Sequence, residues 1–284
     1  GDVADINNDG FLDLMTLDMN PKDYIRSKTT MGMTSISQFE KMTANGYHFQ
    51  YMHNMLQLNN GNGTFSEISK MAAVGDTDWS WAVLLADFDL DGLNDIYVTN
   101  GVFRDVIDRD SNKAIVDQLR KNNRKPTKED FLKYAQMLPQ QKLANYFYKN
   151  KGDLTFEDTS NKWSNDAPSF SNGAIYADLD NDGDLDIVVS NINDEATILK
   201  NNAKDKKDAN SLQIRLQGPK SNQFGLGAQI HVLLEDSTKM TRQLINTRGF
   251  LSSVSNEIHF GLGDNASIKK VEVKWQDGKT QELT

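Results

Sequence analysis

The chain of 284 residues has 40 acidic against 31 basic side chains, a net charge of −9 and a hydrophobic content of 38%. This length and apolar content suffice for a hydrophobic core in one large or two ordinary domains. The acidic excess argues against a nucleic-acid partner, because binding to phosphates requires clustered Lys and Arg. No apolar stretch approaches the roughly 20 residues that are needed to span a bilayer. The absence of cysteine excludes disulfides and thiol catalysis.

A nine-residue pattern occurs three times, beginning at residues 5, 87 and 178. Each copy has oxygen-bearing side chains at positions 1, 3, 5 and 9 and a glycine at position 6. The side chains are Asp5, Asn7, Asp9 and Asp13 in the first copy, Asp87, Asp89, Asp91 and Asp95 in the second, and Asp178, Asp180, Asp182 and Asp186 in the third.

This spacing is what a tight loop needs to bind a hard divalent cation, with a backbone carbonyl at position 7 as a further ligand. The carbonyls would be those of Phe11, Leu93 and Asp184. Twelve of the 40 acidic residues lie in the three copies, and three divalent ions would offset six of the nine excess negative charges. We therefore predict up to three calcium sites, the weakest in the copy with Asn7.

An EF-hand is the obvious alternative, but its loop ends in a glutamate at position 12, where this chain has Thr16, Val98 and Val189. The β-branched runs after each copy predict strands, whereas EF-hand and dockerin-like loops precede a helix. Asp, Asn and Gly also dominate ordinary acidic turns, although three in-register copies argue against that reading.

Two further elements recur around the loops. Residues 56–69 and 146–160 each predict a hairpin with an Asn/Gly turn and a Thr-Phe strand, and a shortened copy begins at Ile198. Apolar segments 79–86 and 170–177 lead into the second and third loops. The resulting four-stranded unit is typical of a β-propeller blade.

The loop followed by a strand, with Asn-Asn-Gly-x-Gly-Thr-Phe in the hairpin, resembles the FG-GAP or VCBS repeat of integrin-α-like propellers. The resemblance covers residues 1–202 and implies a calcium-binding propeller. Such propellers usually have seven blades, whereas this chain has about three units. We expect a partial propeller with further blades upstream or from a partner, because the first loop follows Gly1 closely without a leading strand.

Two insertions interrupt the units. Residues 20–55 carry aromatic residues beside Met31, Met33, Met42, Met52 and Met55, which suit either an adaptable binding surface or, as we expect, packing onto the propeller. Residues 102–145 are polar and predict helices: Thr127 and Asp130 approximate a capping box, and Pro139 ends the helical run. Insertions on one face of a repeat protein often form its binding face.

Residues 203–210 form a polar linker, after which residues 211–284 predict alternating antiparallel strands. Segments 224–232, 248–253, 258–264 and 271–279 resemble the ASPIC/UnbV domain, which follows a VCBS propeller in the cartilage acidic protein family and in bacterial surface proteins. The insertions and the Trp-Ser-Trp at 79–81 resemble Bacteroidota versions. The predicted class is thus all-β: propeller blades with helical insertions, then a small antiparallel β-sandwich or barrel-like domain.

The strong motifs are used for metal binding or turns. The four histidines lack zinc-ligand spacing, and no G-x-S-x-G nucleophile elbow occurs. We therefore favour a non-catalytic, calcium-binding adhesion or interaction module, extracellular or at a cell surface, with a protein or glycan partner and possible membership of an outer-membrane complex. Its signal sequence would lie outside this chain. The alternative is a glycan hydrolase or lyase with its site on the insertion-bearing face.

Overall fold

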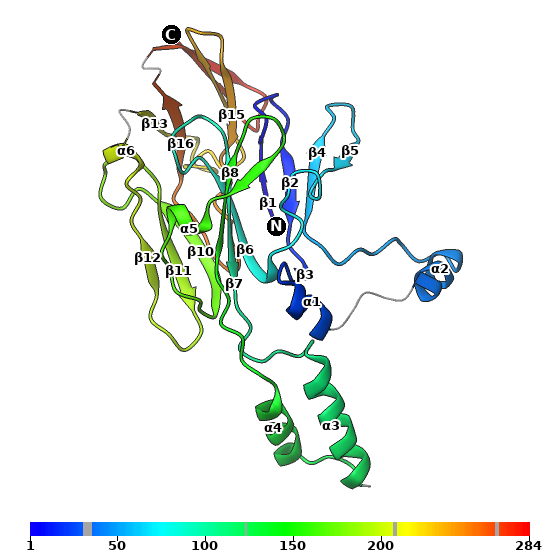
Figure 1. Cartoon of the computed structure of the whole chain (residues 1–284). Helices are drawn as coiled ribbons and strands as arrows, with labels where there is room; N and C mark the ends of the chain where they lie inside the picture. The colour runs from blue at the N-terminus through cyan, green and yellow to red at the C-terminus, as the bar shows by residue number, and fades with distance from the viewer. Residues whose placement is uncertain (31–35, 123, 207–208, 265–266) are drawn as a thin grey trace.

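The computed structural model describes residues 1–284 apart from 31–35, 123, 207–208 and 265–266, so Met31 and Met33 lie outside it. The described chain is mostly β, with three sheets before residue 200 and two after residue 209. Figure 1 shows the first three sheets side by side, with the C-terminal sheets at one end and α3 and α4 projecting at the other. The expected β class with helical insertions is confirmed.

Blade one contains β1 (Asp2–Ala4), β2 (Asp13–Thr16), β4 (Met55–Asn59) and β5 (Phe65–Glu67), antiparallel and in that order. The expectation that the first loop lacks its leading strand is therefore wrong. Strand β1 supplies it, with Asp2 opposite Met15. Three residues are too few for alternation to reveal a strand in the sequence, whereas pairing with β2 defines it in the fold.

Blades two and three repeat this arrangement. Blade two contains β3 (Met19–Asn20), β6 (Asp78–Ala86), β7 (Asp95–Asn100), β8 (Tyr146–Asn150) and β9 (Phe156–Asp158). Blade three contains only β10 (Ser171–Ala177), β11 (Asp186–Asn191) and β12 (Thr197–Leu199). Each blade thus combines the strand before its acidic loop with the strand after it, and the third blade ends one strand early.

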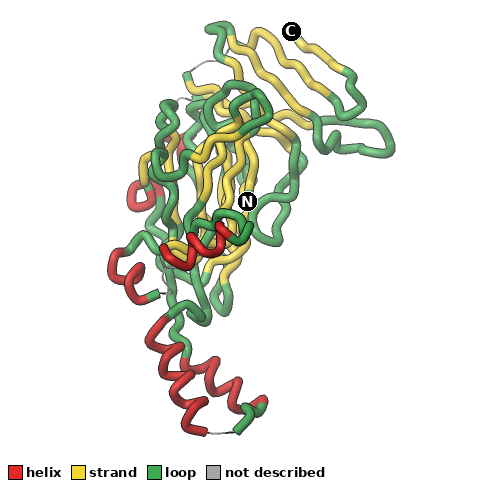
Figure 2. The backbone as a smooth tube through the Cα atoms, turned by 90° about the vertical axis from the view of Figure 1, so that its right-hand side faces the viewer, coloured by secondary structure: helices red, strands yellow, loops and turns green. Residues whose placement is uncertain are grey.

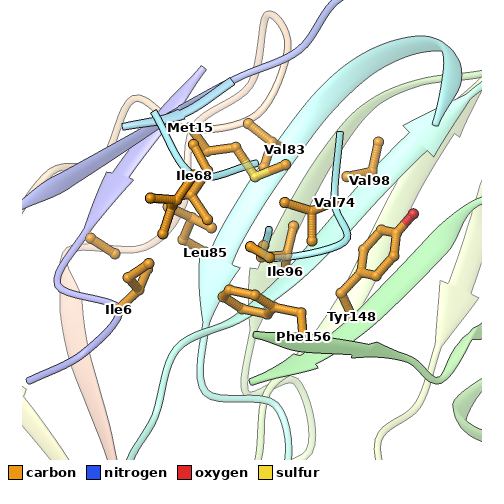
Figure 3. Close-up of a cluster of buried hydrophobic side chains, with 13 residues drawn as sticks. Ile6, Met15, Ile68, Val74, Val83, Leu85, Ile96, Val98, Tyr148 and Phe156 are labelled. Carbon is orange, nitrogen blue, oxygen red and sulfur yellow. The ribbon is translucent and has the colours of Figure 1, made fainter. Parts of the chain in front are cut away.

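Blade two lies between the other two and packs on both. All six residues of β7 are buried. Because successive strand side chains point to opposite faces, Ile96 and Val98 join the core shared with blade one, and Tyr97 joins the core shared with blade three. Figure 3 shows the first of these cores, which contains Ile96 and Val98 of blade two together with Ile6 and Met15 of blade one. The central strand is therefore apolar on both faces.

The first insertion contains α1 (Tyr24–Thr29) and α2 (Ile36–Ala44), neither of which has a buried residue. Figure 1 shows α2 held away from the sheets. Our expectation that this insertion packs onto the propeller is wrong for α2 and for residues 45–51, which are exposed. Its aromatic rings pack on one another instead, with centroids 5.9 Å apart for Phe39 and Phe49 and 5.7 Å apart for Phe39 and Tyr51.

The second insertion forms a helical pair, α3 (Arg109–Asn122) and α4 (Lys128–Met137), which extends from the sheets (Figure 2). The predicted capping box is confirmed, because the Thr127 N–H donates to the Asp130 carboxylate at 2.8 Å and the Asp130 N–H donates to the Thr127 hydroxyl. Tyr134 is buried, and Asn122 donates to its hydroxyl. The two helices therefore support each other rather than the blades.

The C-terminal region forms two sheets around one core. Strands β13 (Asn210–Arg215) and β16 (Glu257–Gly263) pair in one, and the other has the order β15 (Lys239–Gln243), β14 (Gln229–Leu234), β17 (Ile268–Lys274), β18 (Thr280–Leu283). Ile230, Val232 and Phe260 lie in the core between them. This two-sheet packing agrees with the predicted sandwich, whereas β18, exposed throughout, gave no alternation that sequence analysis could detect.

The C-terminal domain contacts all three blades. The short helix α6 (Ala203–Lys206) leads from blade three into the domain. The Phe250 ring lies 4.9 Å from the Trp81 ring of blade two. Arg248 forms a buried ion pair with Asp2 of blade one and also donates to the Val3 carbonyl. The domain therefore binds the blades to one another.

Replacing Arg248 by alanine is expected to lower the free energy of unfolding by about 3 to 5 kcal/mol, because it leaves the Asp2 carboxylate buried and uncompensated. Urea unfolding measures this. Arg215→Ala removes an exposed ion pair with Glu257 and is the matched control, expected to cost about 1 kcal/mol or less. Equal costs for the two variants would contradict the interfacial role of Arg248.

Candidate metal centre

The three acidic loops adopt the same backbone conformation. Loop one (residues 5–13) joins β1 and β2, loop two (87–95) joins β6 and β7, and loop three (178–186) joins β10 and β11. Position 4 lies in the left-handed region in all of them, with φ of 57° at Asn8, 63° at Leu90 and 61° at Asn181. The glycine at position 6 has φ of 94°, 90° and 97°, values that a residue with a Cβ rarely adopts.

The carboxylate at position 1 organises each loop by accepting two backbone hydrogen bonds, one on each oxygen. The donors are the N–H groups of positions 5 and 6, at 3.1 and 2.8 Å from Asp5, 3.1 and 2.8 Å from Asp87, and 3.1 and 3.2 Å from Asp178. The position-5 carboxylate then accepts from the N–H of position 7. Aspartate at these positions is therefore required for the turn itself.

The carboxylate at position 9 fastens the loop to its blade. One oxygen accepts from the N–H of position 2, and the other accepts from the N–H of an asparagine at the end of the first hairpin strand. These pairs are Asp13 with Ile6 and Asn59, Asp95 with Phe88 and Asn150, and Asp186 with Leu179 and Asn201. Sequence analysis predicted only that these asparagines lie in a turn. Their role was not found because it depends on contacts with residues far away in the sequence.

The same asparagines connect neighbouring blades. The Asn150 side chain donates to the carbonyls of Asn94 in its own loop and Ile6 in loop one, at 2.9 and 2.8 Å. The Asn201 side chain donates in the same way to the carbonyl of Leu185 in its own loop and, at 2.7 Å, to the carbonyl of Phe88 in loop two. Asn59, in blade one, donates to Leu12 in its own loop. The loops are thus linked in a chain from blade to blade.

The predicted ligands come together in two of the three loops. Carboxylate oxygens of Asp87, Asp89 and Asp95 lie within 4.8 Å of one another in loop two, as do those of Asp178, Asp180 and Asp182 in loop three. Loop one has an amide in place of one carboxylate, and Asn7 donates to Asp9 at 2.9 Å. One oxygen of the buried Asp184 side chain has no hydrogen-bond partner, so this side chain is a further candidate ligand beside its predicted carbonyl.

Two lysines provide positive charge at these clusters. Lys149 pairs with Asp89 and, at 2.6 Å, with Asp91 in loop two, and Lys200 pairs with Asp180 at 2.5 Å in loop three. The equivalent position beside loop one, immediately before the hairpin asparagine, is Leu58. A divalent cation would have to displace the ammonium group of Lys149 in loop two and that of Lys200 in loop three.

Burial and mutual repulsion oppose ionisation of several loop carboxylates. Burial, reinforced by the charge of Asp91, raises the pKa of Asp87 to about 7, and burial raises the pKa of Asp13 to about 6. The pKa of Asp184 rises to about 6, first through burial and then through Asp182. The donor set of hard oxygens and the excess negative charge both fit a cation such as calcium, which would favour the ionised forms.

The C-terminal domain covers these loops. The Gly263 N–H donates to the Leu90 carbonyl at 2.8 Å, and a Cβ on Gly261 would lie 2.1 Å from an oxygen of Asp87. His259 contacts the Gly183 carbonyl at 2.9 Å, consistent with a packing rather than a zinc-binding histidine. The buried Arg242 donates to the Gly92 carbonyl and lies near Asp5 and Asp87. Sequence analysis missed this cap, because no local pattern signals contacts between domains.

Comparison with known families agrees with this architecture. Residues 44–98 and 139–189 match the FG-GAP-like repeat, and residues 218–284 match the ASPIC and UnbV domain. The chain carries FG-GAP-like repeats and a C-terminal ASPIC/UnbV domain. The matched ASPIC/UnbV residues include the β14, β16 and β17 strands that form its core and Gly261, which touches loop two.

The chain is also similar to cartilage acidic protein 1 of Mus musculus, with 26% identity over 249 residues. The aligned part is 80% of this chain but 38% of the mouse protein, so the chain spans well under half of that relative. The FG-GAP-like repeats, the ASPIC/UnbV domain and this relative together point to an extracellular interaction module. None of the helices in the described residues combines the length and apolar character needed to cross a bilayer.

Removing the amide of Asn150 is expected to weaken the contact between the first two FG-GAP-like blades. Asn150→Ala leaves the buried Ile6 and Asn94 carbonyls without this donor and should cost about 2 to 4 kcal/mol in urea unfolding. Asn59→Ala removes the equivalent bond within blade one only and should cost about half as much. If the two variants lose the same stability, Asn150 does not act between blades.

The loop carboxylates also predict how stability depends on pH. Asp87 is buried and its pKa is raised to about 7, so the folded state binds this proton more tightly than the unfolded chain does. In EDTA, the unfolding free energy should therefore fall by about 2 to 4 kcal/mol as the pH rises from about 4 to about 7. Calcium, which binds the ionised form, should oppose the fall. Urea unfolding at a series of pH values in this range tests both expectations. If calcium leaves the change of unfolding free energy with pH unaltered, the assignment of a calcium site is wrong.

Proposed function

We propose that this chain is a non-catalytic calcium-binding interaction module of an extracellular or cell-surface protein. The observation that carries the proposal is the repetition of one acidic loop in three blades, beneath a domain that contacts all three. Calcium would neutralise the clustered carboxylates and so stabilise both the loops and the contact with the cap. The metal would thus stabilise the fold, and the partner would bind to other surfaces of the chain.

Those surfaces are the insertions, at the end of the blades remote from the loops (Figure 1). Exposed apolar side chains occur on these insertions, including Tyr24 and Ile25 in α1 and Phe131 and Leu132 in α4. Large exposed apolar side chains of this kind are typical of protein contact sites. We propose a protein or glycan partner at the cell surface for this end, as in a subunit of an outer-membrane complex.

Further blades, from upstream or from a partner, are part of the same proposal. Phe65 of blade one is 51% exposed, whereas Phe156 at the same hairpin position of blade two is 5% exposed in the core shared with blade one. A neighbouring blade on that side would cover Phe65 in the same way.

The alternative, a glycan-cleaving enzyme, receives no support from the cavity beside the acidic loops. Asp87 and Glu257 line a cavity of about 40 Å³ beneath the C-terminal domain. That volume suits a few water molecules rather than a sugar ring, since one water needs roughly 10 to 15 Å³ on the same measure. An assay of the chain against a panel of acidic and neutral glycans would distinguish the alternatives, and specific turnover would refute the non-catalytic proposal.

Calorimetric titration with calcium tests the metal sites, which should bind with oxygen distances of about 2.3 to 2.6 Å in a crystal structure. EDTA should lower the melting temperature. Asp180→Asn gives loop three the amide that loop one has at position 3, and it should weaken one site by about tenfold, since ligand charge tunes affinity. Asp194→Asn, which removes an exposed carboxylate outside the loops, is the control. Absence of heat at millimolar calcium, with an unchanged melting curve in EDTA, would refute the metal assignment.

A further inference from the structure

The C-terminal domain carries an open cleft that none of the acidic loops helps to form. Its volume is about 470 Å³, compared with about 40 Å³ for the cavity beneath the domain. The lining comes from residues 217–222, between β13 and β14, and from residues 275–279, between β17 and β18. Sites for small ligands are typically clefts of about 300 to 1,000 Å³. This C-terminal cleft therefore has the size of a ligand site.

Both segments of the C-terminal cleft are fixed by their own hydrogen bonds. The Asn222 side chain accepts from the Leu226 N–H and donates to the Leu226 carbonyl, both at 2.9 Å. The Trp275 N–H donates to the Lys279 carbonyl at 2.9 Å, which closes the turn between β17 and β18. The Lys279 N–H in turn donates to the Asp277 carboxylate at 3.1 Å. The walls are thus formed before a ligand binds, which lowers the entropic cost of binding.

Trp275 provides the apolar wall of the cleft. Its side chain packs against the core of the C-terminal domain, and a Cβ on Gly225 would lie 2.9 Å from a carbon of the ring. Gly225 also has a φ of 69°, so a glycine is favoured there on both grounds. The ring is therefore held in place, yet the residue is only half-buried and lines the cleft. A tryptophan in this position offers a large apolar surface and one N–H donor.

The polar part of the lining carries no net charge. Gln217, Ser221 and Gln276 are exposed, and their side chains have no hydrogen-bond partner among the described residues. Asp277 and Lys279 pair with each other at 2.7 Å, so their charges offset one another. The cleft thus presents an aromatic ring beside neutral amide and hydroxyl groups.

We propose that the C-terminal cleft binds a neutral oligosaccharide. A pyranose ring has an apolar face of C–H groups and a rim of hydroxyl groups. The face would stack on Trp275, and the hydroxyl groups would bond to the amides of Gln217 and Gln276. The balanced charge of the lining favours an uncharged sugar over a uronic or sialic acid, whose carboxylate would lose hydration without gaining a free cation.

Two observations set this ligand apart from the alternatives. Asp277 is the only carboxylate among the described residues of the lining, whereas glycosidic cleavage generally uses a pair, so the cleft would bind a glycan without cleaving it. Trp275 is the only aromatic residue described there, whereas proline-rich peptides bind grooves lined by several aromatic rings.

The proposal goes beyond the partner surface proposed for the insertions. The domain that carries the cleft lies at the end of the molecule opposite to α3 and α4 (Figure 1). A chain with both surfaces could hold a glycan at one end while the insertions contact their own partner at the other.

Calorimetric titration of the full chain tests the proposal, with cellohexaose, xylohexaose, mannohexaose and maltohexaose as probes. We expect saturable binding of at least one of them, with the same affinity in calcium and in EDTA, because the lining contains no residue of the acidic loops. Hexagalacturonate, in which every ring carries a carboxylate, should bind at least about tenfold more weakly than the best neutral probe.

Protein variants locate the binding. Trp275→Leu keeps an apolar side chain against the core but removes the stacking ring, and should weaken binding at least about tenfold. Gln217→Ala combined with Gln276→Ala removes two exposed amides and should also weaken binding about tenfold. Gln281→Ala removes an exposed amide from β18, outside the cleft, and is the matched control that should leave binding unchanged. The glutamine variants keep the test valid if Trp275→Leu fails to fold.

Three results would overturn the proposal. The first is the absence of binding by all four neutral hexasaccharides. The second is binding that neither Trp275→Leu nor the paired glutamine variant weakens, which would place the sugar on another surface such as the insertions. The third is binding of a decaproline peptide that depends on Trp275 while the sugars do not bind, which would assign the cleft to a proline-rich segment. Each of these results leaves the calcium assignment to its own titration.

Discussion

The fold depends on carboxylates that have two functions at once. At positions 1 and 9 of each loop, both oxygens accept backbone N–H bonds, so these aspartates define the turn and attach it to the hairpin of the same blade. The same requirement brings several negative charges together in a buried place. The hydrogen bonds offset only part of the free-energy cost of burying these charges together, since the pKa of Asp87 is still raised. The backbone thus creates a site of negative potential that a cation relieves.

The blades differ in how this charge is offset, although their backbones repeat. In loops two and three, Lys149 and Lys200 lie against the aspartates at position 3. Loop one has neither this lysine nor a carboxylate at position 3, because Leu58 and Asn7 occupy the equivalent positions. Fewer ligand charges weaken cation binding, whereas the absence of a lysine at the position of Leu58 favours it. The charge count alone therefore does not determine the order of affinities in this chain.

Most of the blade architecture could be predicted because its signals are local. The Asp-x-Asp-x-Asp-Gly spacing, the β-branched run after it and the Asn/Gly hairpin each lie within about ten residues, and each corresponds to an observed loop, strand or turn. Strand β1 was missed because three residues carry no periodicity, and the exposure of α2 was missed because methionine and aromatic residues suit a core and a surface equally well.

The rest of the candidate site depends on contacts between distant residues. Asn150 occurs in an unremarkable turn sequence, yet its amide joins two blades, and Arg248 has no local motif but pairs with Asp2 at the other end of the chain. The C-terminal domain was recognised from its own strands. Its position over the loops depends on Gly261 and His259, whose partners lie in loops two and three. Sequence patterns identify elements, whereas these pairings arise only from the packing of elements.

The repetition also makes each blade a reference for its neighbours. Phe65 and Phe156 occupy the same position of the same hairpin, yet one is exposed and the other buried, so burial is determined by the adjacent blade rather than by the residue. Burial of such a side chain therefore stabilises the contact between two blades rather than the single blade that carries it. The cavity beside Leu199 and Asn201 lies at the next contact of this kind, between blades two and three, and both blades contribute to its lining.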